Sequence, residues 1–130
     1  MIILPYFKKS LAKNLASEKL LKSGCSVKNS KGIIDGIIDA EHCNIKSHGF
    51  HYLPIYCNHL KIGKIKGKAS PTFEQISNSS IKVDADNGFA HTAINIGLKH
   101  LIEMSSNEGI SCMSIYNSYN CGVLGFHTKR

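Results

Sequence analysis

The chain has 130 residues, of which 42% are hydrophobic and 19% charged, with a formal net charge of +7. A chain of this length can bury one hydrophobic core but is too short for two full domains. Its composition argues against intrinsic disorder, which goes with fewer aliphatic residues and more charge. No apolar run approaches the length of a membrane span. We therefore expect a globular chain, or a piece of one, with no membrane partner.

The positive charge comes almost entirely from lysine, because Arg130 is the only arginine. The one dense run, from Lys61 to Lys68, alternates with isoleucine and glycine. Surfaces that read bases or clamp phosphates favour arginine, whose planar fork makes paired hydrogen bonds. The sequence thus argues against specific nucleic-acid binding and favours a solvated surface that attracts anionic substrates or cofactors.

Five cysteines stand at positions 25, 43, 57, 112 and 121, without a Cys-x-x-Cys pair. Cys43, Cys57 and Cys112 lie in apolar patterns, where a free thiol packs as a small hydrophobic group. The odd number indicates reduced thiols in a reducing cytoplasm. The apolar start, residues 1–7, lacks the basic region and the cleavage site of a secretory signal.

The first half of the chain predicts three helices. Leucines at helical spacing predict the first over residues 7–23, with Gly24 as its stop; these leucines are Leu11, Leu15, Leu20 and Leu21. Ser26 is a good N-cap for the second, which carries an isoleucine stripe over residues 33–38 and fades near residues 43–44. The third begins near Phe50, tolerates Pro54 in its first turn and ends at Gly63.

Two glycines inside the second predicted helix, Gly32 and Gly36, allow two interpretations. Each lowers helix propensity by about 1 kcal/mol. The alternative is that they permit close packing of another helix.

After a connector over residues 63–71, the period changes to that of strands. Residues 72–76 and 80–84 alternate with period two and predict a hairpin with its turn at 77–79. A turn at 86–88, a helix over 90–106 and an apolar strand over 110–116 follow. The strand leads into an apolar, glycine-containing tail with nothing after it to pack against. The sequence therefore predicts an α+β chain whose mixed sheet is incomplete.

Ser47-His48-Gly49 interrupts the helical periodicity and is the most suggestive local feature. Glycine lets the backbone turn sharply, so the histidine ring can point into a cleft. Imidazole titrates near neutral pH and suits proton donation to a carbonyl or imine that is being reduced. From the spacing alone, the alternative is a serine that caps the next helix beside a solvent-facing histidine.

Two further patterns have chemical and plain interpretations. Zinc would accept the side chains of His48, His51, Cys57 and His59, but their spacing does not converge on a tetrahedron, so we predict no metal site. Residues 117–125 follow a strand and could bring backbone amides close to a phosphate. They do not fit the strand–GxGxxG–helix dinucleotide fingerprint, and a plain turn is the alternative.

Taken together and in order, these segments resemble the malate/L-lactate dehydrogenase type 2 family, which includes ureidoglycolate dehydrogenases, sulfolactate dehydrogenases and piperideine-2-carboxylate reductases. The resemblance covers about residues 10–130. Each motif is weak alone, and the ordered series is specific. The matching segments are residues 20–24, 38–41 with Ser47-His48-Gly49, 53–65, Pro71 with 83–88, and 109–125.

The resemblance implies roles for individual residues. His48 would donate a proton to the substrate carbonyl or imine, and Ser47 would be its relay partner, completed in the family by an aspartate further along than residue 130. The loop of Asn120, Cys121, Gly122, Val123 and Leu124 would lie against NAD or NADP, whose nicotinamide supplies the hydride. The implied fold has a helical front and an unusual mixed sheet, is not of the Rossmann type, and forms homodimers in the full-length protein.

The sequence departs from the family pattern in three respects. Many members carry an arginine four residues after the histidine, where this chain has Tyr52, which cannot form a charge-assisted bidentate pair; His51 is a candidate substitute for binding the substrate carboxylate. A second histidine of many members is replaced by Asn120, which does not titrate. Family chains are also more than twice as long.

Our leading hypothesis is an N-terminal portion of an NAD(P)-dependent oxidoreductase acting on a small 2-hydroxy, 2-oxo or cyclic imino acid, with little activity as a fragment. Residues 1–63 would form the helical part, and residues 64–130 the start of the cofactor-binding α/β domain. The alternative is a non-catalytic remnant or a basic interaction module.

Overall fold

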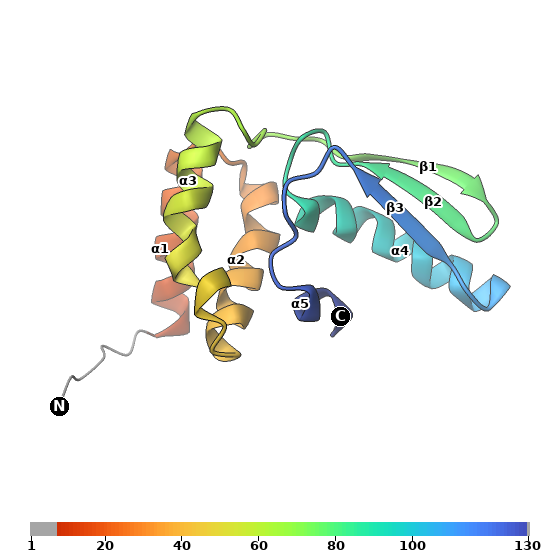
Figure 1. Cartoon of the computed structure of the whole chain (residues 1–130), viewed down its shortest axis with the longest axis horizontal. Helices are drawn as coiled ribbons and strands as arrows, with labels where there is room; N and C mark the ends of the chain where they lie inside the picture. Colours follow the sequence, from red (N-terminus) through yellow and green to blue (C-terminus); the bar gives the residue numbers. More distant parts are fainter. Residues whose placement is uncertain (1–7, 130) are drawn as a thin grey trace.

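The computed structural model describes residues 8–129, so the apolar start considered above as a signal lies outside the described residues. A layer of three helices lies at one end, and a small sheet backed by one long helix lies at the other (Figure 1). In chain order the elements are α1 (Lys9–Lys22), α2 (Val27–His42), the 3₁₀ turns η1 (Lys46–His48) and η2 (Phe50–Tyr52), α3 (Leu53–Lys61), β1 (Thr72–Ser77), β2 (Ser80–Asp84), α4 (Ala90–Glu108), β3 (Cys112–Tyr116) and α5 (Leu124–Thr128). This mixed composition agrees with the α+β prediction.

Within residues 8–129, no helix is both long enough and apolar enough to cross a membrane.

Helix α2 forms as its sequence predicts. The Ser26 side chain accepts a hydrogen bond from the backbone N–H of Asn29 at 3.2 Å, which satisfies one free donor of the first turn. All four isoleucines of the stripe are buried in the helical core. Helix α3 likewise buries Leu53, Tyr56 and Leu60, and Pro54 lies in its first turn, where no helical hydrogen bond is lost.

Helix α1 buries a different face from the one its leucines predict. Leu11 and Leu15 are 55% and 47% exposed, whereas Ala16 and Leu20 are fully buried and Ala12 packs beside them. The buried stripe therefore follows the i, i+4 spacing of Ala12, Ala16 and Leu20. Small side chains on this stripe let α1 lie close to its neighbours, which leaves the other leucines facing out.

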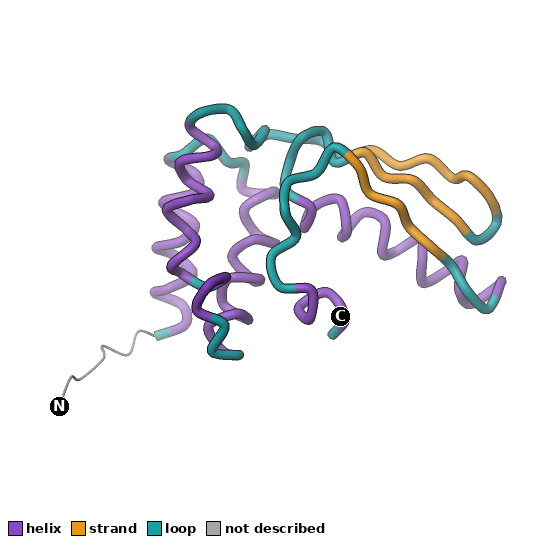
Figure 2. Tube along the Cα trace, viewed as in Figure 1, coloured by secondary structure: helices purple, strands orange, loops and turns teal. Residues whose placement is uncertain are grey.

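The sheet has the order β1-β2-β3 (Figure 2). β1 and β2 form the predicted antiparallel hairpin, and β2 pairs in parallel with β3. Parallel neighbours need a crossover, and α4 provides it. Ile81 and Val83 of β2 are buried, with Met113 and Ile115 of β3 packed beside them. The opposite face carries polar residues such as Lys82, whose ammonium lies 4.5 Å from the centre of the Tyr116 ring.

The buried apolar residues form two clusters, one among α1, α2 and α3 and one between the sheet and α4. Ile65 and Phe89 come from the second half of the chain but belong to the helical cluster. The division at residues 63 and 64 stays a prediction, because these two side chains connect the halves.

The two glycines of α2 permit close helix packing, as one of our interpretations proposed. A Cβ atom added at Gly32 would lie 3.0 Å from Cβ of His91, and one added at Gly36 would lie 3.0 Å from its Nε2 atom. His91 is 2% exposed in the first turn of α4. The glycines therefore make the room in which α4 crosses α2.

All five cysteines are free thiols, but their burial differs from the prediction. Cys43 and Cys112 are exposed, and Cys57 is half-buried. The buried thiol is that of Cys25, beside α1 and α2 in the helical core. Burial, and secondly the nearby Cys57, raise the pKa of Cys25 to about 12.

Alkylation of the native chain is therefore expected to modify Cys43 and Cys112 first and Cys25 last, because the thiolate is the reacting form and Cys25 is both shielded and held as a thiol. Peptide mass spectrometry after timed iodoacetamide treatment measures the order. In urea, the unfolded chain should lose this difference. Equal alkylation rates for Cys25 and Cys112 in the native chain would contradict the burial of Cys25 in the helical core.

Candidate active site

The Ser47-His48 pair lies in the short turn between α2 and α3. The Ser47 hydroxyl and Nδ1 of His48 are 2.9 Å apart, and either can donate, depending on the histidine tautomer. The serine side chain caps neither the two 3₁₀ turns nor α3, so the plain interpretation of Ser47 as a helix cap is wrong. This contact holds the imidazole by Nδ1 and leaves Nε2 as the nitrogen available to another group.

Glu41, at the end of α2, fixes the backbone of this turn. Its Oε1 atom accepts a hydrogen bond from the N–H of Phe50 at 2.7 Å, and Oε2 lies 3.6 Å from the Lys46 ammonium. A side chain at Gly49 would collide with the Glu41 carboxylate. The glycine is therefore required for space, so that the acidic side chain can reach under the turn that presents His48.

Tyr52 connects the histidine to the core. Its ring stacks on the His48 ring with an interplanar angle of 10° and 6.2 Å between centres. It also packs edge-on against the Tyr56 ring, with 4.8 Å between ring centres. Tyr56 is 2% exposed, and its burial raises its pKa. The half-buried His48 thus rests on a row of rings that begins in the hydrophobic core.

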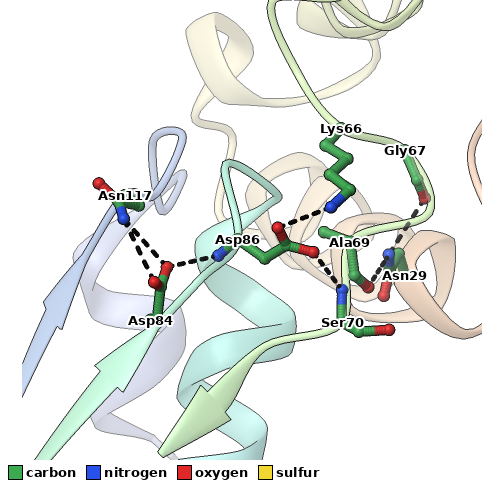
Figure 3. A network of polar contacts seen from close by, with 8 residues as sticks. All are labelled: Asn29, Lys66, Gly67, Ala69, Ser70, Asp84, Asp86 and Asn117. Carbon is green, nitrogen blue, oxygen red and sulfur yellow. Dashed lines mark hydrogen bonds and ion pairs between the residues drawn. The ribbon is translucent and has the colours of Figure 1, made fainter.

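The loop that follows β3 is held in place by the turn at residues 84–88 (Figure 3). Asn117 donates from its side chain to both carboxylate oxygens of Asp84, at 3.2 and 3.3 Å. Its backbone carbonyl accepts from the N–H of Asn87, and the N–H of Tyr119 donates to the carbonyl of Gly88, both at 2.8 Å. Asn117 has a φ of 50°, which asparagine tolerates better than most residues. These bonds turn the chain from the sheet back toward the helices.

The second aspartate of this turn also has a structural role. Asp86 forms an ion pair with Lys66 at 2.7 Å and accepts from the N–H of Ser70 at 2.9 Å (Figure 3). The hydrogen bond from Lys66, followed by that from Ser70, lowers the pKa of Asp86. Both aspartates of the 83–88 segment are therefore occupied in holding loops together.

At α3 the loop meets the row of rings. The Tyr56 hydroxyl donates to Oδ1 of Asn120 at 3.3 Å, and the Tyr119 hydroxyl lies 2.6 Å from Nδ1 of His59. Oδ1 of Asn120 also accepts from the N–H of Gly122 at 3.3 Å. The structure thus brings the His48 turn and the residue 120 loop into one contact series, His48–Tyr52–Tyr56–Asn120, although they are far apart in sequence.

The rest of the loop continues along this side of the molecule into α5. The Cys121 carbonyl contacts Nε2 of His127 at 2.7 Å, which ties the loop to α5. Gly122 has a φ of 69°. Leu124 is 72% exposed, and Val123 is half-buried. His51 is exposed and forms no side-chain hydrogen bond or ion pair with other residues of the described chain, so its assignment to substrate stays a prediction.

Four residues in this arrangement were not singled out as site residues in the sequence: Glu41, Tyr56, His59 and Tyr119. His59 was considered only as a zinc ligand, and within residues 8–129 no group of three or more histidine, cysteine or acidic side chains could hold a metal ion. His59 instead contacts Tyr119, which lies 60 residues away in the chain. Periodic patterns in a sequence reflect neighbours a few residues apart, so they could not predict a contact between residues 60 positions apart. For Glu41, the signal was its place in the segment that matches the family.

The sequence profile of the malate/L-lactate dehydrogenase family matches residues 7–130. The chain belongs to this family. A Δ1-pyrroline-2-carboxylate reductase of Burkholderia ambifaria is 33% identical over 110 residues, which cover 85% of this chain and 32% of that protein. A (2R)-3-sulfolactate dehydrogenase (NADP+) of Chromohalobacter salexigens is 34% identical over 94 residues, covering 72% of this chain and 28% of that protein.

A solved structure shows the same fold. The Δ1-piperideine-2-carboxylate reductase of Pseudomonas syringae pv. tomato superposes with a TM-score of 0.88 at 25% identity, covering 93% of this chain and 36% of that protein. The present chain therefore spans about a third of the length of the relatives it matches. The resemblance found in the sequence is confirmed, as is the mixed helix-and-sheet fold.

Proposed function

We propose that this chain contributes the proton-donating and nicotinamide-facing part of an NAD(P)-dependent oxidoreductase that acts on a small 2-oxo, 2-hydroxy or cyclic imino acid. The observation that supports it most is the contact series from His48 to Asn120. It connects a histidine suited to acid–base chemistry, through Tyr52 and Tyr56, with the glycine-containing loop. The family relatives that reduce imino acids or oxidise hydroxy acids support the same chemistry.

In this proposal His48 donates a proton from Nε2 to the carbonyl or imine of the substrate, and Ser47 holds Nδ1. A reduction needs that proton because the hydride leaves a negative charge on the oxygen or nitrogen. Tyr52 and His51 bind the substrate carboxylate. These are roles of the chain's own side chains; the nicotinamide, when bound, supplies the hydride.

The loop of residues 120–124 has features that suit a nicotinamide. Leu124 and Val123 offer apolar surface for a planar ring. A Cβ atom added at Gly125 would meet nothing within 4 Å, so the backbone there is open to an approaching group. Asn120 uses its oxygen within the protein and keeps its side-chain amide donor free for a cofactor carboxamide.

Other parts of the proposal concern the whole protein. We propose a helical part over residues 1–63 and the start of a cofactor-binding domain of non-Rossmann type over residues 64–130. We further propose a homodimer in the full-length form. A reducing cytoplasm suits five free thiols. The 130-residue chain by itself is expected to have little activity, because it spans only about a third of its relatives.

The test is a set of reduction assays with the whole protein that carries this segment. The fall in NAD(P)H absorbance measures turnover in each assay. Cyclic imino acids such as pyrroline-2-carboxylate and open-chain 2-oxo acids are the substrates to compare. We expect turnover with at least one of them, and none without the acid. Absence of NAD(P)H oxidation with every member of both classes would overturn the proposal.

A second candidate is a non-catalytic remnant or basic interaction module. Two observations favour it: a tyrosine at position 52, where many family members have arginine, and Asn120 in place of a histidine. Fluorescence titration with NADH and NADPH separates the two candidates, because a remnant should bind neither.

A further inference from the structure

His127, on the short helix α5, reaches back to the loop of residues 120–124. Its Nε2 atom lies 2.7 Å from the carbonyl oxygen of Cys121. A carbonyl oxygen can only accept a hydrogen bond, so Nε2 carries the proton and donates it. Nδ1 of the same ring is buried and has no hydrogen-bond partner within residues 8–129. The polar contact of this side chain is therefore directed at the loop backbone.

The peptide unit between Cys121 and Gly122 is held at both of its ends. Its N–H, on Gly122, donates to Oδ1 of Asn120 at 3.3 Å, and the same oxygen accepts from the Tyr56 hydroxyl at 3.3 Å. These two bonds are long and therefore weak, whereas the bond from His127 is short. The peptide unit is planar and trans, so its carbonyl and its N–H point in opposite directions. By holding the carbonyl, His127 thus fixes the direction of the Gly122 N–H.

Packing keeps His127 and the loop in this relation. The His127 ring lies against the rings of His91 and Phe126, with 5.2 and 5.1 Å between ring centres. His91 is buried in the first turn of α4. Gly122 has a φ of 69°, and a Cβ atom added to it would lie 3.5 Å from the His91 ring. The loop and the ring that holds it therefore rest on the same buried side chain.

The two hydrogen bonds to its oxygen give the Asn120 amide one favoured orientation. A half-turn of the amide would place two donors, its NH₂ group and the Gly122 N–H, against each other. Asn120 is exposed, and its side-chain nitrogen forms no hydrogen bond within the described residues. The group that Asn120 keeps for a ligand is therefore the NH₂ donor.

We infer that His127 is a positioning residue for the cofactor: through the peptide between Cys121 and Gly122, it holds the Asn120 amide with its NH₂ group toward the carboxamide oxygen of the nicotinamide. The identity of this outward partner rests on the proposed function. A carboxamide oxygen is an acceptor, so only this orientation of Asn120 pairs with it. The two ends of an amide differ in their hydrogen-bonding roles, so Asn120 needs its orientation to be set by the protein.

His127 lies apart from the proposed proton donor. In the part of the chain that the structure describes, no hydrogen bond or ring contact joins it to Ser47, His48 or Tyr52. Loss of its N–H should therefore weaken cofactor binding without changing the binding of the acid substrate. A side chain that only stabilised the fold would not separate these two effects.

Two variants of the whole protein test the donor. H127L removes the N–H and keeps an apolar side chain, whereas H127Q keeps an N–H that can reach the Cys121 carbonyl. We expect H127L to raise Kd and KM for NAD(P)H by about three- to tenfold, the effect of losing one hydrogen bond, and to leave KM for the acid unchanged. H127Q should bind NAD(P)H as the wild type does. A wild-type Kd in H127L, or an equal loss in H127Q, would overturn the inference.

Nuclear magnetic resonance tests the positioning without a cofactor. In the 130-residue chain, the resonances of the Asn120 side-chain amide and of the Gly122 N–H should move in H127L and stay near their wild-type positions in H127Q. H42L is the matched control, since it removes an exposed histidine at the end of α2 and should move neither resonance. Amide resonances of α1 and β2 report whether each variant keeps the fold. Asn120 resonances that H127L leaves unmoved would contradict the positioning role.

The wild-type chain gives a result that does not depend on the variants. Ring nitrogen shifts should show His127 as the tautomer with its proton on Nε2, and the opposite tautomer would rule out the bond to Cys121 as described. If the wild-type whole protein binds neither NADH nor NADPH, the proposed function fails. The resonances of the 130-residue chain then still decide whether His127 positions Asn120.

Discussion

Replacing His48 by alanine is expected to lower kcat of the whole protein by about 100-fold to 10,000-fold, the contribution of a positioned general acid. The imidazole is held by Ser47 on one side and by the Tyr52 ring on the other. Water would have to supply the proton in the variant. Steady-state kinetics with saturating NAD(P)H and substrate measure the loss.

The matched control is H42A, which removes an exposed histidine at the end of α2 and should keep wild-type turnover. The kcat of S47A should lie between those of H48A and H42A, because this variant keeps the imidazole but removes the hydrogen-bond partner of its Nδ1 atom. Wild-type kcat in H48A would show that the proton comes from elsewhere.

Replacing Phe89 by alanine is expected to lower the free energy of unfolding by about 3–5 kcal/mol, the range for truncating a buried phenylalanine. Phe89 is 1% exposed and packs edge-on against Tyr56 at 5.5 Å and against Tyr119 at 6.0 Å. It lies immediately before α4, and its ring is buried in the helical core. Its loss would leave a cavity under the aromatic row that supports His48.

Urea unfolding followed by circular dichroism measures this change. The control is I102A on α4, where the side chain is 60% exposed and a change within about 0.5 kcal/mol is expected. A loss in F89A as small as that in I102A would mean that the helical core and the sheet are not joined through this ring.

Local patterns predicted most of the secondary structure. Isoleucine periodicity and a serine cap predicted α2, and period-two alternation predicted the β1–β2 hairpin, because each depends on neighbours within a few residues. The predicted buried face of α1 was wrong. Leucine periodicity suggested one face, but the helices pack on the face with alanines, because small side chains let two helices approach closely. The tail over residues 121–126 was described only as apolar and glycine-containing, and the structure has the short helix α5 over Leu124–Thr128.

The site was predictable only in part. The Ser47–His48 contact is local and followed from the sequence. The contact between α3 and the loop after β3 did not, because Tyr56 and Asn120 are 64 residues apart and His59 and Tyr119 are 60 apart. That contact depends on the hydrogen bonds from Asn117 and Tyr119 to the 84–88 turn, which redirect the chain after the sheet. The resemblance to a family gave the candidate residues, and the fold gave their proximity.

The most direct test of the central claim is a crystal structure of the whole protein with NAD(P)H and a non-reactive analogue of a 2-oxo acid. We expect the nicotinamide ring to lie against residues 120–124, the analogue's oxygen to lie within hydrogen-bonding distance of Nε2 of His48, and its carboxylate to face Tyr52. A cofactor bound away from this loop, or an analogue out of reach of His48, would contradict the account.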